Sequence, residues 1–171
     1  MEEIFGTHHE RQGDWRDNAQ ICPNGHLANS SMKLCPEFNQ EFCQECGEKT
    51  LTACQHCQEP IRGDYHMENV LGGFGYTPPR HCHNCGKPFP WIERTLEAAK
   101  ELTDEIDELI PEEREKLKGT LNDLIVDTPR TELAATRFKK LVSKGGKATA
   151  LALEKILTGI VTEAAKKAIW G

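Results

Sequence analysis

The feature that most constrains the fold of this chain is a set of three C-x2-C pairs in its first half. They are Cys43/Cys46, Cys54/Cys57 and Cys82/Cys85, and two of them continue into glycine, as CQECG and CHNCG. In a zinc knuckle, a glycine directly after the second cysteine closes the tight turn at low steric cost. Three such pairs in one region predict structural zinc sites.

The segment CPNGHLANSSMKLCPEFNQEFCQEC, residues 22–46, offers five candidate ligands for one tetrahedral ion, which takes four. Its first part, CPNGH, has Asn and Gly at turn positions between a cysteine and a histidine. Cys35 stands alone, and a solitary cysteine is harder to aim at a metal already held by two knuckles. A set in which Cys35 replaces His26 remains the alternative. The predicted ligands of this first site are Cys22, His26, Cys43 and Cys46.

The other two pairs form a second predicted site with the spacing C-x2-C-x24-C-x2-C, longer than the ~15–20 residues of the usual ribbon. The intervening segment has enough glycine and proline for a hairpin or a longer loop. Within it we expect Arg62-Gly63-Asp64 to form a turn, and Gly72-Gly73-Phe74-Gly75 to form a bend rather than a phosphate-binding loop. The predicted ligands are Cys54, Cys57, Cys82 and Cys85.

Both predicted ions, two Zn²⁺ per chain, are expected to be structural. Large apolar side chains are scarce between residues 18 and 90, so a core alone cannot offset ~1.5 kcal/mol of ordering entropy per residue. A structural zinc ion contributes ~10–16 kcal/mol of apparent binding free energy to folding. Four protein ligands leave no open coordination position, so we expect neither ion to be catalytic.

The start of the chain, MEEIFGTHHE, is acidic and lacks the apolar region of a secretory signal. No segment approaches the ~18 consecutive apolar residues of a membrane span. We therefore expect a cytoplasmic protein without membrane contact, in which the eight cysteines stay reduced and point to metal or redox use rather than to disulfides. The net charge of −6 argues against a general nucleic-acid binder.

Every cysteine and histidine lies at or before Cys85, and the chain from Trp91 onward is rich in Ala, Leu, Glu and Lys. There, apolar residues recur at three- and four-residue steps, which is typical of amphipathic helices. Proline and glycine positions divide this pattern into four helices. They are expected to begin at Pro90, at Pro111, at Pro129 with Thr128 as the N-cap, and at about residue 147, with the last running to about residue 169.

The predicted fold class is α+β: a small zinc-ribbon region of β-hairpins followed by an all-α helical bundle. Residues 1–17 are expected to be a flexible leader. The ribbons are expected to be tandem units, 18–51 and 52–90, and the helical domain is expected to cover 91–171.

The knuckle sequences CPNGH, FCQECGEKT, CQHCQEPIRGDY and CHNCGKPFPW, followed by TPRTELAATRFKKL in the helical part, resemble an uncharacterised bacterial zinc-ribbon family, a domain of unknown function. The similarity covers nearly the whole chain after about residue 17, and the knuckles are its most specific part. The resemblance implies a zinc-ribbon fold and the eight ligands named above, with His26 favoured over Cys35. It implies no established biochemical activity.

No nucleophile–base set, phosphate-binding loop or open metal site is visible in the sequence. The predicted function is a non-enzymatic adaptor or regulator, whose ribbon loops (such as 63–79) and helices bind a protein partner or self-associate. A phage-defence or toxin-like component ranks lower, because its only support is that the chain looks like a small bacterial protein. The other alternative is a nucleic-acid-associated module using a cationic surface, although the same cations could instead pair with acidic faces of the bundle. That surface would comprise Arg130, Arg137, Lys139, Lys140, Lys144 and Lys147.

Overall fold

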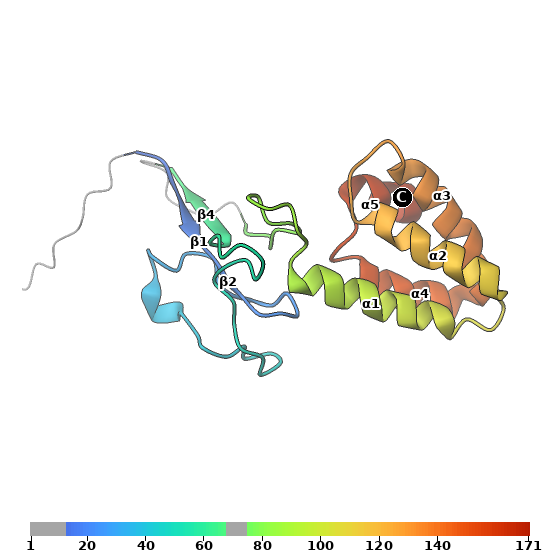
Figure 1. Cartoon of the computed structure of the whole chain (residues 1–171), viewed down its shortest axis with the longest axis horizontal. Coiled ribbons are helices and arrows are strands. Elements are labelled where there is room, and N and C mark those ends of the chain that lie inside the picture. The colour runs from blue at the N-terminus through green and yellow to red at the C-terminus, as the bar shows by residue number, and fades with distance from the viewer. Residues whose placement is uncertain (1–12, 68–74) are drawn as a thin grey trace, which may run out of the picture.

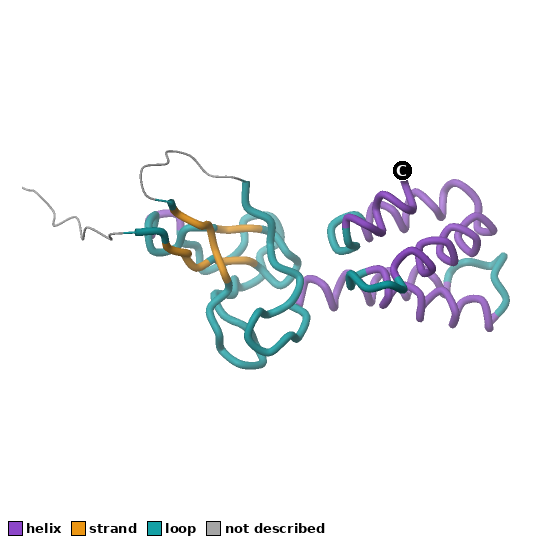
Figure 2. Tube along the Cα trace, turned by 90° about the horizontal axis from the view of Figure 1, so that it is seen from above, coloured by secondary structure: helices purple, strands orange, loops and turns teal. Residues whose placement is uncertain are grey.

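The computed structural model describes residues 13–67 and 75–171. The molecule is elongated, with strands and loops at one end and helices at the other, and α1 leads from one part into the other (Figures 1 and 2). The predicted α+β class is confirmed, because short antiparallel strands precede a set of helices. Most of the expected leader, residues 1–12, and most of the expected glycine bend, residues 72–74, lie outside the described residues.

Four short strands form two antiparallel pairs. β1 pairs with β4, and β2 pairs with β3, each with one irregularity in register. The first strand begins inside the segment expected to be a leader, so the folded region starts earlier than predicted. The strands are β1 (Trp15–Asn18), β2 (Gln20–Ile21), β3 (Leu27–Asn29) and β4 (Arg62–His66).

A buried carboxylate explains why the chain is already folded at β1. Asp17 is 1 % exposed. Its Oδ1 accepts the backbone N–H of Lys33 at 3.0 Å, and its Oδ2 accepts that of Leu34 at 3.0 Å. A buried charge is tolerated only when its hydrogen bonds are satisfied, and these amides anchor the loop after β3 to β1.

The two predicted ribbons, 18–51 and 52–90, are in direct contact with each other. The N–H of Ala19, in the first ribbon, donates to the carbonyl of Ile61, in the second, at 2.8 Å. Ala19, Ile21 and Ile61 are all fully buried. Because β1 also pairs with β4, the two ribbons share one small core.

The prediction of a turn at Arg62-Gly63-Asp64 is wrong, because these residues lie in β4. A Cβ on Gly63 would come within 2.2 Å of the carbonyl oxygen of Ser30. The glycine therefore allows close approach of two backbones rather than a turn. The N–H of Asp64 donates to that same Ser30 oxygen at 2.8 Å.

The second half is a compact group of helices. α1 packs against α2 and α4, α2 packs against α3, and α3 packs against α5. Proline occupies the first turn of both α1 and α2, as predicted, because a proline there loses no helical hydrogen bond. The helices are α1 (Pro90–Asp104), α2 (Pro111–Leu124), α3 (Thr131–Val142), α4 (Gly146–Leu157) and α5 (Glu163–Trp170).

The single helix predicted from about residue 147 to 169 is wrong, because α4 and α5 are separate. Between them Ile160 and Val161 are buried, and the side chain of Thr162 accepts the N–H of Ala165 as the N-cap of α5. The N–H of Thr162 donates to the carbonyl of Leu124 at 3.0 Å, which ties this turn to the end of α2. The broad apolar arc in the sequence comes from two helices and a buried turn.

A continuous apolar core crosses from the strands into the helices. At the junction the rings of Phe89 and Trp91 stack with centroids 4.6 Å apart and an interplanar angle of 9°. Both side chains are buried, and the Trp91 Nε1–H donates to the carbonyl of Pro79 at 3.0 Å. The two halves therefore contact each other directly, beyond the covalent link at Pro90.

Candidate metal centres

Each of the three C-x2-C pairs forms a turn closed by the same two backbone hydrogen bonds. In the pair beginning at Cys43, the N–H of Gly47 donates to the Cys43 carbonyl at 2.9 Å, and the N–H of Cys43 donates to the Glu48 carbonyl at 2.8 Å. The pairs beginning at Cys54 and Cys82 repeat both bonds at 2.8–2.9 Å. The repetition indicates that a short local sequence is enough to form each knuckle.

The residue after each C-x2-C pair has a left-handed backbone conformation. Gly47 has a φ of 72° and Gly86 has a φ of 70°, as the predicted role of these glycines requires. After the remaining pair, Cys54/Cys57, this position is occupied by Gln58, with a φ of 62°. A residue with a Cβ pays roughly 1–2 kcal/mol in the left-handed conformation. The rest of this knuckle must therefore hold the Gln58 backbone in a conformation that it would not adopt by itself.

The CPNGH turn is one residue tighter than the C-x2-C knuckles. The N–H of Gly25 donates to the Cys22 carbonyl at 2.9 Å, and the N–H of Cys22 donates to the His26 carbonyl at 3.0 Å. Gly25 takes the left-handed conformation, with a φ of 87°. The second ligand therefore comes after the glycine rather than before it, and the longer imidazole side chain reaches back to the position that a thiol fills elsewhere.

The structure brings the eight predicted ligands together in two groups of four. Within each group, the ligand atoms all lie within 4.8 Å of one another. The four knuckles pair in sequence order, the first with the second and the third with the fourth. The first group is Cys22, His26, Cys43 and Cys46, and the second is Cys54, Cys57, Cys82 and Cys85.

The distances within the groups fit a tetrahedral zinc ion. With Zn–S bonds of ~2.3 Å and a Zn–N bond of ~2.0–2.1 Å, the sulfur–sulfur edges should be about 3.8 Å and the sulfur–nitrogen edges about 3.6 Å. The sulfurs of Cys22 and Cys46 are 3.7 Å apart, and His26 Nδ1 lies 3.5 Å from the Cys22 sulfur.

The second group fits equally well, with 3.6 Å between the sulfurs of Cys57 and Cys82 and 3.7 Å between those of Cys54 and Cys85. A disulfide would place two sulfurs ~2.05 Å apart. All eight cysteines are free thiols, which agrees with ligand sets and not with cross-links.

The first ligand of each knuckle faces the protein and the second lies nearer to solvent. Cys22, Cys43, Cys54 and Cys82 are each at most 7 % exposed. Cys46 and His26 of the first group are exposed. Each group thus lies at the edge of the core, where cysteine sulfurs also contribute buried apolar surface.

Two of the solvent-facing thiols have a pKa below the ordinary value, in the absence of metal. The pKa of Cys46 is lowered to about 6, first by the backbone N–H of Glu48 and then by the side chain of Asn24. The pKa of Cys57 is lowered to about 7, first by the backbone N–H of Glu59 and then by the side chain of Asn84. Because the thiolate is the form that binds metal, each group contains one sulfur prepared for coordination.

The thiol of Cys22 behaves in the opposite way. Burial raises its pKa to about 11, because removing a thiolate from water disfavours the charged form. A bound dication would provide the charge that this buried sulfur needs to ionise. The buried first ligand of this group therefore fits a metal better than it fits an isolated thiol.

Cys35 belongs to neither group among the described residues. It directly precedes a 3-10 turn, Pro36–Phe38, and its carbonyl accepts the Asn29 side chain at 2.8 Å. The structure thus brings His26, and not Cys35, to the other three ligand atoms of the first group.

Sequence reasoning missed the polar partners of the ligands. Asn24 donates through Nδ2 to the Cys46 sulfur at 3.3 Å, although the sequence suggested only a turn role for it. Asn84 contributes to the lowered pKa of Cys57 from the same sequence position in its own knuckle. The shared signal is an asparagine two residues after the first cysteine of a knuckle, in CPN and CHN, which could have been noticed.

Taken together, the strands, knuckles and helices define a protein with two zinc-ribbon-like ligand groups and a C-terminal helical domain. The chain belongs to a family described as an uncharacterised protein conserved in bacteria (DUF2321), whose model matches residues 15–169. The family resemblance seen in the sequence is therefore confirmed, and the match starts where β1 starts. No curated protein and no solved structure matches the chain. Within the described part of the chain, every helix is too short or too polar to cross a membrane.

Proposed function

We propose that this protein binds two structural zinc ions and acts as a non-enzymatic adaptor. The observation that carries the metal assignment is the convergence of two complete sets of four zinc-type ligands, each within 4.8 Å. Three thiolates and an imidazole would saturate the first ion and four thiolates the second, and a saturated site has no position for a substrate. Zinc would then supply the cross-links that the small apolar core of this half lacks.

One cluster of polar side chains resembles a hydrolase triad in composition but not in geometry. Ser31 Oγ lies 3.4 Å from His66 Nε2, and Asp17 Oδ2 lies 3.8 Å from that same nitrogen. In a working triad the acid contacts the other ring nitrogen and orients the base. Asp17 is instead occupied by backbone amides of the neighbouring loop. This supports a structural role for the cluster and a non-enzymatic protein.

The adaptor role is supported by apolar side chains exposed on the first ribbon. Leu34, Phe38 and Phe42 are 56 %, 61 % and 55 % exposed. The backbone of Phe42 forms an antiparallel β-bridge with that of Lys49 at the base of the second knuckle. Zinc binding to this knuckle would therefore hold Phe42 in place. Exposed apolar groups of this size are typical of surfaces that contact another protein.

Several of the cationic residues that could have formed a nucleic-acid surface are engaged within the helical domain. Lys144 pairs with Glu113 at 2.5 Å, Arg130 pairs with Asp123 at 3.7 Å, and Lys139 donates to the carbonyl of Ala168 at 3.3 Å. These contacts favour the interpretation that the charges attract one another inside the domain. Retention on DNA or RNA that falls steeply with added salt would count against the adaptor proposal.

The metal assignment is tested by measuring the zinc content of the purified full chain and of two variants. Wild type should hold close to two ions per chain. Cys54→Ser should lose about one ion and part of its folding stability, because it removes a buried ligand. Cys35→Ser, a matched change outside both groups, should keep two ions. Loss of an ion from Cys35→Ser, or no zinc in wild type, would contradict the assignment.

The adaptor assignment is tested by crosslinking in cells, followed by identification of the proteins captured. Phe38→Ser and Phe42→Ser should lose the partner captured by wild type while retaining two zinc ions. Leu151→Ser, an equally exposed change on α4, is the matched control and should retain the partner. Equal capture by all four proteins would remove the first ribbon as the binding surface.

A further inference from the structure

The two ligand groups share an asparagine at one knuckle position and differ in what supports it. In the first group Asn24 of one knuckle donates to the Cys46 sulfur of the partner knuckle at 3.3 Å, and in the second group Asn84 holds the same sequence position, two residues after the first cysteine of its knuckle. Such outer hydrogen bonds orient metal ligands, and losing them typically weakens metal binding ~10–100-fold. The two sites are therefore built alike up to this point.

Only in the first group does a helix reach the asparagine. Arg94, in the first turns of α1, donates from Nη1 to Asn24 Oδ1 at 2.9 Å, across 70 residues of sequence. The same nitrogen lies 3.1 Å from Glu48 Oε1, in the turn that follows Cys46. Within the described residues, the side chain of Asn84 receives no corresponding hydrogen bond from a helix.

The hydrogen bond from Arg94 fixes the orientation of the Asn24 side-chain amide. A guanidinium has only donors, so it must face the amide oxygen. The amide nitrogen then necessarily points the other way, toward the Cys46 sulfur. If Arg94 were removed, the Asn24 amide would lose the partner of its oxygen, and its hydrogen bond to the Cys46 sulfur would be held in place less firmly.

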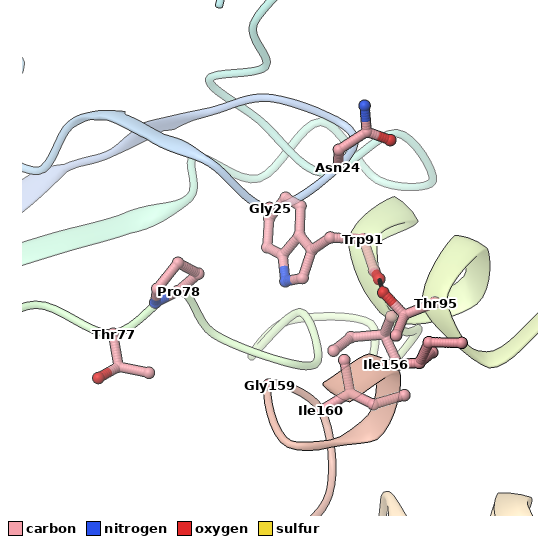
Figure 3. A pocket seen from close by; sticks show the side chains of 10 residues that line it. Asn24, Gly25, Thr77, Pro78, Trp91, Thr95, Ile156, Gly159 and Ile160 are labelled. Atoms are coloured by element: carbon pink, nitrogen blue, oxygen red, sulfur yellow. Dashed lines mark hydrogen bonds between the residues drawn. The ribbon is translucent and has the colours of Figure 1, made fainter. Parts of the chain in front are cut away.

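The backbone next to Asn24 is also in contact with α1. A Cβ on Gly25 would lie 3.1 Å from the Trp91 Cβ, so the first knuckle and the first turn of the helix are in close packing. Figure 3 shows Trp91 beside Gly25 at one side of a cleft of about 310 Å³, with Ile156 and Ile160 on the other side. The position of Arg94 relative to Asn24 is therefore set by packing, and the hydrogen bond does not have to hold the helix by itself.

We propose that Arg94 is a positioning residue for the first metal site, acting through Asn24 to hold Cys46, and that zinc retention there depends on the docking of α1. This inference rests on the proposed zinc binding. By linkage, loss of this ion would loosen the contact between α1 and the first knuckle. In the described part of the chain no helix side chain hydrogen-bonds Asn84, so the second site would release its ion independently of Arg94.

The test measures zinc release from the purified full chain into excess 4-(2-pyridylazo)resorcinol, a chromogenic chelator. Samples taken during release are alkylated at their free thiols, and mass spectrometry identifies which cysteines have become accessible. Arg94→Ala should speed release from the first group about tenfold and leave the second group at the wild-type rate. Lys100→Ala, a cation further along the same helix, is the charge-matched control and should behave as wild type.

Two further variants separate positioning from a general loss of stability. Asn24→Ala should reproduce the Arg94→Ala effect, and the double variant should be no faster than Asn24→Ala, because both changes break the same connection. Asn84→Ala should speed release from the second group only, and its effect should add to that of Arg94→Ala.

The outcomes are distinguishable. A wild-type chain without zinc would overturn the proposed function itself. Two results would overturn the positioning role while leaving zinc binding intact. In one, Arg94→Ala holds two ions and loses both faster than wild type to the same extent. In the other, it loses neither ion faster than wild type. Selective opening of Cys22, Cys43 and Cys46 in Arg94→Ala would support it.

Discussion

The two halves of this molecule bury different kinds of side chain. Around the knuckles, the buried residues include four cysteines, with only a few aliphatic partners such as Ile21 and Ile61. In the helical half the buried positions are mostly leucine, isoleucine, valine and alanine, with Leu117, Leu121 and Leu124 fully inside. Under the proposed zinc binding, one half depends on coordination and the other on apolar packing, although a single core connects them at Phe89 and Trp91.

This difference shows how the knuckle half, which has little apolar surface to bury, could still adopt one defined fold. In the knuckle half, residues 13–67 and 75–89 contain no long strand or helix, and their regular strand pairing consists of two two-stranded sheets. Four ligands from two knuckles fix two turns relative to each other at one point. The helices need no such point, because their side chains interdigitate along their length.

The largest expected effect comes from removing the metal. Chelation should unfold the knuckle half, because ~10–16 kcal/mol of apparent binding free energy per ion is lost, and leave α2 and α3 helical. Hydrogen exchange read by mass spectrometry should show rapid exchange in residues 19–61 and continued protection in 117–142. Uniform exchange along the chain, or protection of both regions, would break the comparison between the halves.

A substitution that creates a cavity in the helical core should destabilise the helical half and leave the knuckle half unchanged. Leu121→Ala should lower the free energy of unfolding of the helices by ~2–5 kcal/mol, since Leu121 is fully buried, while zinc content stays at the wild-type value. Chemical denaturation followed at a helical signal measures this. Leu151→Ala, at a site that is 56 % exposed, is the control and should change stability by less than ~0.5 kcal/mol.

The turn between α4 and α5 can be tested at its cap. Thr162→Ala should cost ~1 kcal/mol, because it removes the oxygen that accepts the Ala165 N–H at 3.1 Å. Thr162→Ser should retain most of the stability. Thr136→Ala, on the exposed face of α3, is a matched control. Thermal unfolding is the measurement, and equal losses at both threonines would argue against the cap.

The smallest expected effect concerns the left-handed residue of the third knuckle. Gln58→Gly should stabilise the knuckle half by ~0.5–1 kcal/mol, because it relieves the cost of a φ of 62° and this gain exceeds the added entropy of the unfolded chain. The reverse change, Gly86→Gln, should destabilise the fourth knuckle by a similar or larger amount. Chelator-dependent unfolding of the two variants would compare them, and a destabilised Gln58→Gly would show that the glutamine side chain has a role of its own.

Much of the fold could be read from short-range signals. The starts of α1 and α2 follow from Pro90 and Pro111, and the left-handed glycines follow from CQECG and CHNCG. The break at Thr162 was missed because the three- and four-residue period continues across it. A threonine before a glutamate, three residues after Gly159, was the available signal.

The sequence alone determined that four tight turns would each present two metal-type ligands, because every closing hydrogen bond joins residues five or fewer positions apart. It also determined the helical character of the second half, since amphipathic periodicity is a local property. Only the tertiary structure decided that His26 rather than Cys35 meets the first group, that the two ribbons share a core, and that Arg94 reaches Asn24. Those contacts depend on which surfaces are buried against each other, and no local pattern encodes the distance between residues that are far apart in the chain.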